Sequence, residues 1–103
     1  MQLKKDKILN IYDKFLNKTD KLKIGVSLST DILTMAWSTK EAIYKAISKK
    51  GVSFLKNILI DQISLENKNG VAHYINRGEK KDFNLKFFFL SNYTICFAYE
   101  AYY

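Results

Sequence analysis

The spacing of apolar residues changes once along this chain, and the change restricts the folds that the chain can adopt. From residue 31 to 50 apolar side chains recur at a helical interval, whereas from residue 58 onward they alternate with polar ones. An interval near 3.6 residues is typical of an amphipathic helix, and an interval of two is typical of a strand with one buried face. The sequence therefore predicts an α+β fold in which helices precede strands.

Two helices are expected before the strands. Residues 3–16 carry apolar groups close to helical spacing, and the polar residues 17–29 are expected to form a loop with a short turn or extended piece. The second helix, over 31–50, has the clearest pattern. Polar residues 29–31 offer capping oxygens to its first amides, and Gly51 suits a left-handed exit from its last turn. We expect this long helix to lie across the sheet.

The strands are expected to form an antiparallel meander. Turns are expected at 66–70, which ends in Asn-Gly, at 77–81 and at 91–92, and short turns make neighbouring strands antiparallel. The four predicted strands are residues 58–65, 71–76, 83–89 and 93–99.

Aromatic and aliphatic side chains alternate in the third and fourth predicted strands. Phe83, Leu85, Phe87 and Phe89 share one face of the third strand, and the fourth strand repeats the alternation with Tyr93, Ile95, Phe97 and Tyr99. Because a helix of 31–50 needs an apolar surface to cover, we expect these aromatic residues to lie in the core. The terminal cluster from Tyr99 to Tyr103 is the exception, since we expect it to be an exposed contact surface.

The composition fits a single domain over residues 1–103. Hydrophobic residues make up 48% of the chain and aromatic residues 15%, which suffices for one core. No apolar run is long enough to cross a membrane, and the amino terminus lacks the pattern of a secretion signal, so a cytoplasmic location is expected. A zinc site is not expected, because Cys96 and His73 are the only cysteine and histidine.

The net charge of +7 comes from sixteen lysines and one arginine, Arg77, against ten acidic residues. Lysine-rich surfaces attract polyanions, but arginine is the usual residue for reading bases. An acidic protein or a nucleotide cofactor is therefore favoured over nucleic acid as the partner. A solvated lysine-rich surface without any partner explains the same charge equally well.

The predicted helix of residues 31–50 carries the run Trp-Ser-Thr-Lys-Glu-Ala-Ile-Tyr-Lys at positions 37–45. This run resembles the W-[ST]-x-K-E-A-x-x-K signature of the 4'-phosphopantetheinyl transferases of the holo-acyl-carrier-protein synthase type. Residues 14–17 are similar to the [RK]-F-[FL]-[SN] segment that precedes the signature helix in that family, and 51–54 resemble the segment that follows it. The resemblance covers about residue 8 to the end, and it implies the carboxy-terminal half of such an enzyme.

The resemblance implies transfer of phosphopantetheine from coenzyme A to a serine of an acyl or peptidyl carrier protein, with Mg²⁺. It implies that Glu41 is a metal ligand and general base, and that Lys45 neutralises the pyrophosphate of coenzyme A. Lys40 and Lys14 are the further residues expected to contact coenzyme A. On a helical wheel, Glu41 lies about 40° beyond Trp37 and Lys45 about 40° beyond Glu41, at the rim of the apolar arc. An ordinary i,i+4 ion pair is the simpler reading of this spacing.

Members of the family carry an earlier strand, G-[IV]-D-[IV]-E, whose acids share the metal. That strand would fall at or before Met1, and residues 25–29 repeat its rhythm with serine at both acidic positions. Since one carboxylate holds Mg²⁺ weakly, we expect a second chain or another copy to supply acids, and the isolated chain to be slow or inactive. Four aspartates could substitute, but each is more simply a solvated helix or cap residue: Asp6, Asp13, Asp20 and Asp31.

Two alternatives remain open. The chain could be a non-catalytic half that only binds coenzyme A or an acidic carrier protein. It could also be a small basic nucleic-acid-binding domain whose aromatic residues stack on bases. We rank nucleic acid last, because the strand aromatics are expected in the core.

Overall fold

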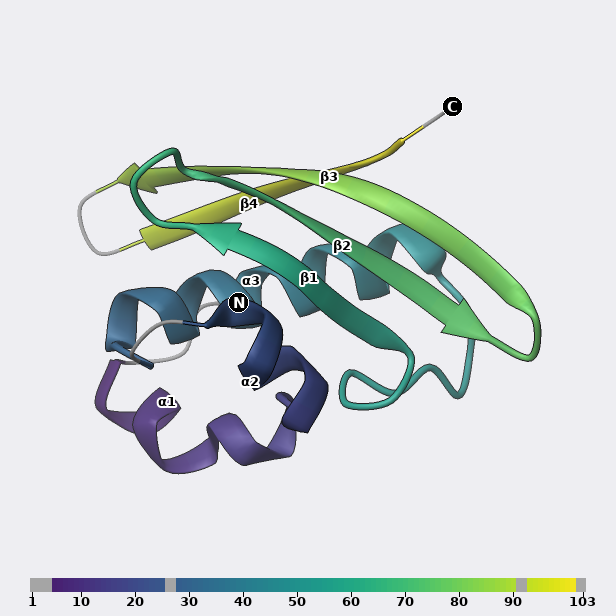
Figure 1. Ribbon diagram of the computed structural model, residues 1–103, viewed down its shortest axis with the longest axis horizontal. Helices are drawn as coiled ribbons and strands as arrows, with labels where there is room; N and C mark the ends of the chain where they lie inside the picture. The colour runs from purple at the N-terminus through teal and green to yellow at the C-terminus, as the bar shows by residue number, and fades with distance from the viewer. Residues whose placement is uncertain (1–4, 26–27, 91–92, 102–103) are drawn as a thin grey trace.

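The computed structural model describes residues 5–25, 28–90 and 93–101, and it confirms the α+β class (Figure 1). The helical segments are α1 (Lys5–Ile11), the 3-10 helix η1 (Tyr12–Lys14), α2 (Lys18–Ile24) and α3 (Thr30–Ile47). The strands, which are antiparallel in the order β1-β2-β3-β4, are β1 (Ile58–Ser64), β2 (Asn69–Asn76), β3 (Glu79–Leu90) and β4 (Tyr93–Glu100). In the described part of the chain, no helix has the length and apolarity that crossing a membrane requires.

The first predicted helix is shorter than expected, and the predicted loop contains a helix. The region 3–16 divides into α1 and η1, and residues 3–4 lie outside the described residues. The helix α2 forms because Asn17 and Asp20 make a reciprocal capping box, with N···O distances of 2.8 and 3.0 Å. Gly25 ends α2 with φ of 67°. The polar composition of this segment thus reflects a capped helix.

The long helix α3 begins where its cap predicts and ends earlier than expected. The amide of Ile32 donates to Ser29 Oγ at 3.3 Å, which satisfies one of the first amides of the helix. The left-handed exit falls at Ser48, with φ of 56°, rather than at Gly51. The helix packs mainly against β4 and also contacts β1, so the prediction that it lies across the sheet is confirmed.

The hairpin turns agree in part with the sequence, and the turn predicted at 77–81 is shorter than expected because β3 begins at Glu79. Arg77 and Gly78 both have positive φ, 50° and 85°, as a two-residue hairpin turn requires. Gly70 instead lies within β2, where a Cβ atom would be only 2.4 Å from the carbonyl oxygen of Gln62. The turn predicted at 91–92 lies outside the described residues.

The inner face of the sheet forms the core with α3, and none of the described helices lies on the outer face (Figure 1). The third-strand prediction holds for Phe83, Leu85 and Phe87, which are buried, and Phe89 is partly buried. All these residues face the helices.

The prediction that the aromatic residues of the fourth strand are core is wrong, whereas the expected exposure of Tyr99 is confirmed. The pairing of Leu85 with Ala98 and of Phe87 with Cys96 turns the small side chains of β4 toward α3. Because α3 packs closely on β4, small residues fit between them and the large ones face outward. The exposed fractions are 61% for Tyr93, 37% for Ile95, 58% for Phe97 and 52% for Tyr99.

Candidate functional site

A groove of about 220 Å³ lies between α3 and β4, on the side of α3 that carries the signature residues. We call it the α3–β4 groove. One wall is a stripe of α3 residues at intervals of three and four, and the other wall is the start of β4. The lining residues are Ser38, Glu41, Ala42, Lys45, Thr94, Ile95 and Cys96.

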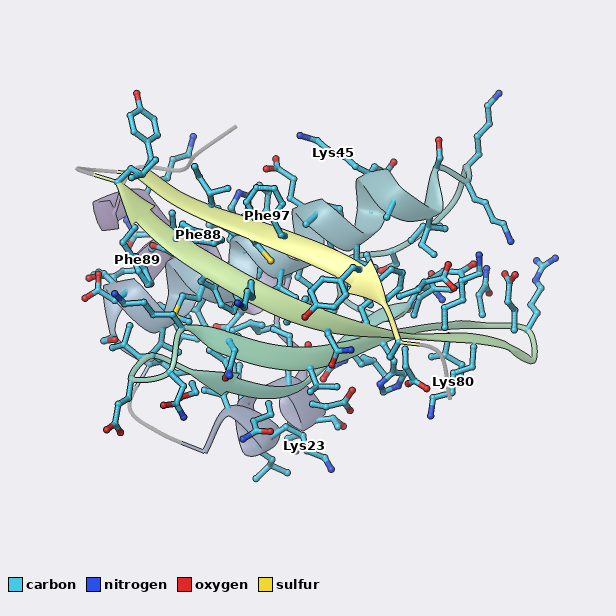
Figure 2. The ribbon with its side chains drawn as sticks, turned by 90° about the horizontal axis from the view of Figure 1, so that it is seen from above. Lys23, Lys45, Lys80, Phe88, Phe89 and Phe97 are labelled. Atoms are coloured by element: carbon cyan, nitrogen blue, oxygen red, sulfur yellow. The ribbon has the colours of Figure 1, made fainter. Side chains whose placement is uncertain are left out.

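Glu41 and Lys45 meet at the lip of this groove, as predicted. Their side chains are 22% and 69% exposed, and Lys45 Nζ lies 4.0 Å from Glu41 Oε1. An exposed i,i+4 pair of this kind stabilises a helix by only a few tenths of a kcal/mol. The ammonium group of Lys45, which Figure 2 shows pointing away from the core, is thus able to turn toward a bound anion at little energetic cost.

Lys40 does not reach the groove, so its predicted contact with coenzyme A is not possible in this conformation. Its side chain is fully buried, and Nζ donates to Asp20 Oδ2 at 2.8 Å, to the carbonyl of Phe54 at 2.7 Å and to the carbonyl of Ile58. Burial lowers the pKa of Lys40, while the Asp20 carboxylate opposes that change. Lys40 therefore holds α3, α2 and the start of β1 together.

Asp20 is a cap residue, as predicted, but it is fully buried rather than solvated. Besides Lys40 it accepts hydrogen bonds from the amides of Asn17 and Ile60, at 3.0 and 2.8 Å. Its carboxylate is buried and held by these three donors, so it cannot supply the missing metal ligand in the groove. Lys14 is exposed on η1 and does not line the groove.

Aromatic contacts fix the rotation of α3 that turns Glu41 outward. Trp37 is partly buried and packs edge-on against Phe15, with ring centroids 5.4 Å apart. Its other neighbour is Phe54, also at 5.4 Å, which in turn contacts Tyr44 at 5.1 Å. The sequence prediction that Trp37 lies at the edge of the core is confirmed.

Cys96 lines the groove as a neutral thiol. Burial raises its pKa to about 12, against a partial offset from a hydrogen bond with Thr39. A thiol of this kind is protonated at neutral pH and is a poor nucleophile. The other distinctive side chain, His73, lies within 2.8 Å of Asp61 Oδ2 and does not line the groove.

The groove fits a magnesium ion only in part. Across the described residues there is no cluster of three histidine, cysteine or acidic side chains suited to a metal. Among the described residues Glu41 is the one carboxylate in the lining, and Mg²⁺ takes one or two carboxylates together with phosphate oxygens and waters. Glu41 can therefore contribute one ligand, and the remaining ones must come from the substrate or another chain.

A second cavity, of about 380 Å³, adjoins the groove through Lys45 at the end of α3. Lys49 pairs there with Glu79 Oε1 at 2.6 Å. Sequence reasoning missed both this cavity and the β4 wall of the groove, although the interval from Ser38 to Lys45 already marked one face of a helix. The lining residues of the second cavity are Tyr44, Lys45, Ser48, Lys49 and Lys50.

Comparison with protein-family models, with curated proteins and with solved structures finds no match to this chain. Its function must therefore be argued from the residues of the groove. The groove combines one partly buried carboxylate, one exposed ammonium group and two hydroxyls, from Ser38 and Thr94. The Ser38 hydroxyl donates to the Thr94 carbonyl at 3.4 Å. Such a set suits the binding of a phosphate ester with a divalent cation.

Proposed function

We propose that this chain provides half of a phosphopantetheinyl transferase site, which uses Mg²⁺ and coenzyme A to modify a serine of a carrier protein. The observation that supports the proposal is the position of Glu41 and Lys45, one helical turn apart on the wall of a groove. The same two residues occupy the acidic and second basic positions in the motif that resembles the family signature.

In this reaction the carrier serine oxygen forms a bond to the phosphorus nearest pantetheine, and the bond from that phosphorus to 3',5'-ADP breaks. The bound cation would polarise the phosphate oxygens. Lys45 would pair with the charge that grows on the leaving pyrophosphate oxygen, and Glu41 would provide a cation ligand and accept the serine proton. Positioning and charge stabilisation of this kind supply most of the acceleration in phosphoryl transfer.

The single carboxylate of the groove implies a second polypeptide. The buried Asp20 is fully engaged with Lys40 and two backbone amides, so it cannot move to the groove without breaking that network. We propose that another chain presents the missing acids beside Glu41. The net charge of +7 also favours association with an acidic carrier protein.

Titration calorimetry with coenzyme A and Mg²⁺ tests this proposal. Lys45→Ala is expected to weaken binding about tenfold, since a charge-assisted hydrogen bond contributes roughly 1.5 kcal/mol or more. Lys56→Ala is the matched control, because Lys56 is also exposed but lies outside the groove. Equal affinities of the two variants would refute the assignment of Lys45.

A non-catalytic binding half is the second candidate, and the lone carboxylate of the groove favours it. Both candidates bind coenzyme A, but only a transferase half increases the mass of an apo carrier protein by one phosphopantetheine group. Mass spectrometry of the carrier, incubated with this chain and an acid-bearing partner, separates the two.

A further inference from the structure

The outer faces of β3 and β4 carry a patch of large apolar side chains. Figure 2 shows Phe88 and Phe97 together above the sheet, and their rings meet edge to face with centroids 5.6 Å apart. Large contiguous apolar patches are uncommon on monomeric proteins and mark interaction sites. We call this the outer patch; its members are 37% to 61% exposed and are Phe88, Leu90, Tyr93, Ile95, Phe97 and Tyr99.

The outer patch borders a sheet edge with which no described strand pairs, because β4 is the last strand in the order. The amide of Ala101 donates to the carbonyl oxygen of Asp82 at 2.8 Å. Because the pattern repeats every two residues, the amide and carbonyl groups of Tyr99, Phe97 and Ile95 also point toward β3. The intervening residues, including Cys96 and Ala98, point theirs to the open side. The β4 edge therefore presents a backbone pattern that an added strand can use.

The opposite edge of the sheet is protected, which makes the exposure of β4 more informative. At β1, the amide of Ile60 donates to the carboxylate of Asp20, and a bulge interrupts the register between Ile60 and Gln62. Register with β3 continues without a shift along β4, and its one charged residue is Glu100 at the end. Charges, bulges and coverage are the usual protection of an edge against pairing. At β4 the carbonyl of Thr94 accepts from Ser38 Oγ at 3.4 Å, so the part of the edge offered to a partner is at Cys96 and Ala98.

We infer that the edge of β4 binds an extended segment of a partner polypeptide, added as a fifth strand, in which apolar and acidic residues alternate. Alternate side chains of an added strand would extend the outer patch beside Ile95 and Phe97. The others would face the α3–β4 groove beside Cys96, where Lys45 attracts a carboxylate. The net charge of +7 also favours an acidic segment.

A second copy of this chain fits the edge less well. Two copies would each bring a charge of +7. Figure 2 also shows the C-terminal part of α3, near Lys45, beside β4 rather than hidden beneath it, and a symmetric copy would bring its own α3 to the same place. That the acidic residues of the added strand complete the Glu41 metal site rests on the proposed function. Strand addition itself does not.

Hydrogen exchange of the ¹⁵N-labelled chain tests strand addition without coenzyme A or magnesium. The probe is a blocked peptide of about eight residues, a common strand length, in which valine alternates with glutamate. We expect the amides of Cys96 and Ala98 to exchange on the order of tenfold more slowly with this peptide. Peptides with glutamine or lysine in place of glutamate are the matched probes, and they should bind in the order glutamate, glutamine, lysine.

Two variants locate the binding. Ala98→Pro removes an amide that faces away from β3, so the β3–β4 ladder survives while strand addition is blocked. Phe97→Ser removes an exposed side chain of the outer patch and should weaken the peptide severalfold. Ile75→Ser, on the exposed face of β2, is the control and should leave peptide binding unchanged.

Each alternative result is decisive. Absence of protection at β4 with all three peptides overturns the inference while leaving coenzyme A binding to be judged by its own titration. Self-association of the free chain that Ala98→Pro abolishes would assign the edge to a second copy. Binding of oligothymidine that weakens steeply with salt and requires Phe97 would assign the patch to nucleic acid. Peptide binding without coenzyme A binding would uphold the inference and reject the transferase proposal.

Discussion

The two sides of α3 differ in whether their charged side chains are buried or exposed. On the β1 side, Lys40 is fully buried and donates to Asp20 and two carbonyl groups. On the β4 side, Glu41 and Lys45 are 4.0 Å apart at the lip of a groove, with Lys45 69% exposed. A buried pair whose hydrogen bonds are all made contributes to a specific fold, whereas an exposed pair contributes little stability and is available to a ligand. Adjacent residues of one helix thus have different roles.

The largest expected effect is on stability, from a substitution on the β1 side of α3. Lys40→Met leaves the carboxylate of Asp20 buried without its counter-charge, which should lower the free energy of unfolding by about 3–5 kcal/mol. Urea denaturation measures this, and Lys45→Met should change stability by less than about 0.5 kcal/mol. Adding Asp20→Asn to Lys40→Met should recover part of the loss. Equal effects of the two lysine substitutions would remove the distinction between the sides.

The next effect concerns the thiol on the groove wall. With its pKa raised to about 12 from 9.0, Cys96 at pH 8 should react with iodoacetamide on the order of a thousandfold more slowly than in the unfolded chain. The raised pKa also means that the unfolded chain ionises first, so stability is kept below pH 9 and falls between pH 9 and about 12. Cys96→Ala should show a smaller fall. Rapid alkylation of the native chain would show that the groove is more open than described.

On the β4 side of α3, the expected effect is on coenzyme A binding and not on stability. In the unaltered chain Mg²⁺ is expected to increase the affinity for coenzyme A. Glu41→Gln should abolish that increase, because the amide is a poor cation ligand. The midpoint of urea unfolding should stay the same. Glu66→Gln, in the β1–β2 turn, is the control with an exposed carboxylate. A Mg²⁺ effect that survives Glu41→Gln would mean that the cation binds elsewhere.

The smallest effect is expected from the outer patch in the isolated chain. Phe97→Ser removes a side chain that is 58% exposed, so the free energy of unfolding should change by only a few tenths of a kcal/mol. Phe87→Ala, on the inner face of the sheet, should instead lower stability by about 3 kcal/mol or more. Similar losses in both variants, measured by urea unfolding, would show that the outer face is covered.

The sequence predicted the helices and strands whose apolar spacing is long and uninterrupted. It was less informative where contacts between distant residues decide which side chains are buried. The pattern of α3 and the strand alternation followed directly from residue spacing, so the α+β class was predictable. The burial of Lys40 was not predictable, because its partner Asp20 lies twenty positions earlier in a segment that we expected to be a loop. The alternation in β4 identified two faces but not which one is inside. That depends on how closely α3 approaches β4, which residue types alone do not determine.

The central claim is that the α3–β4 groove binds the pyrophosphate of coenzyme A. The most direct test is a titration of the ¹⁵N-labelled chain with coenzyme A and Mg²⁺, followed by amide chemical shifts. We expect the largest changes at Ser38, Ala42, Thr94 and Cys96, and in Lys45→Ala the same changes should need about tenfold more coenzyme A. Shifts confined to the outer patch, or no shifts at saturating coenzyme A, would contradict the claim.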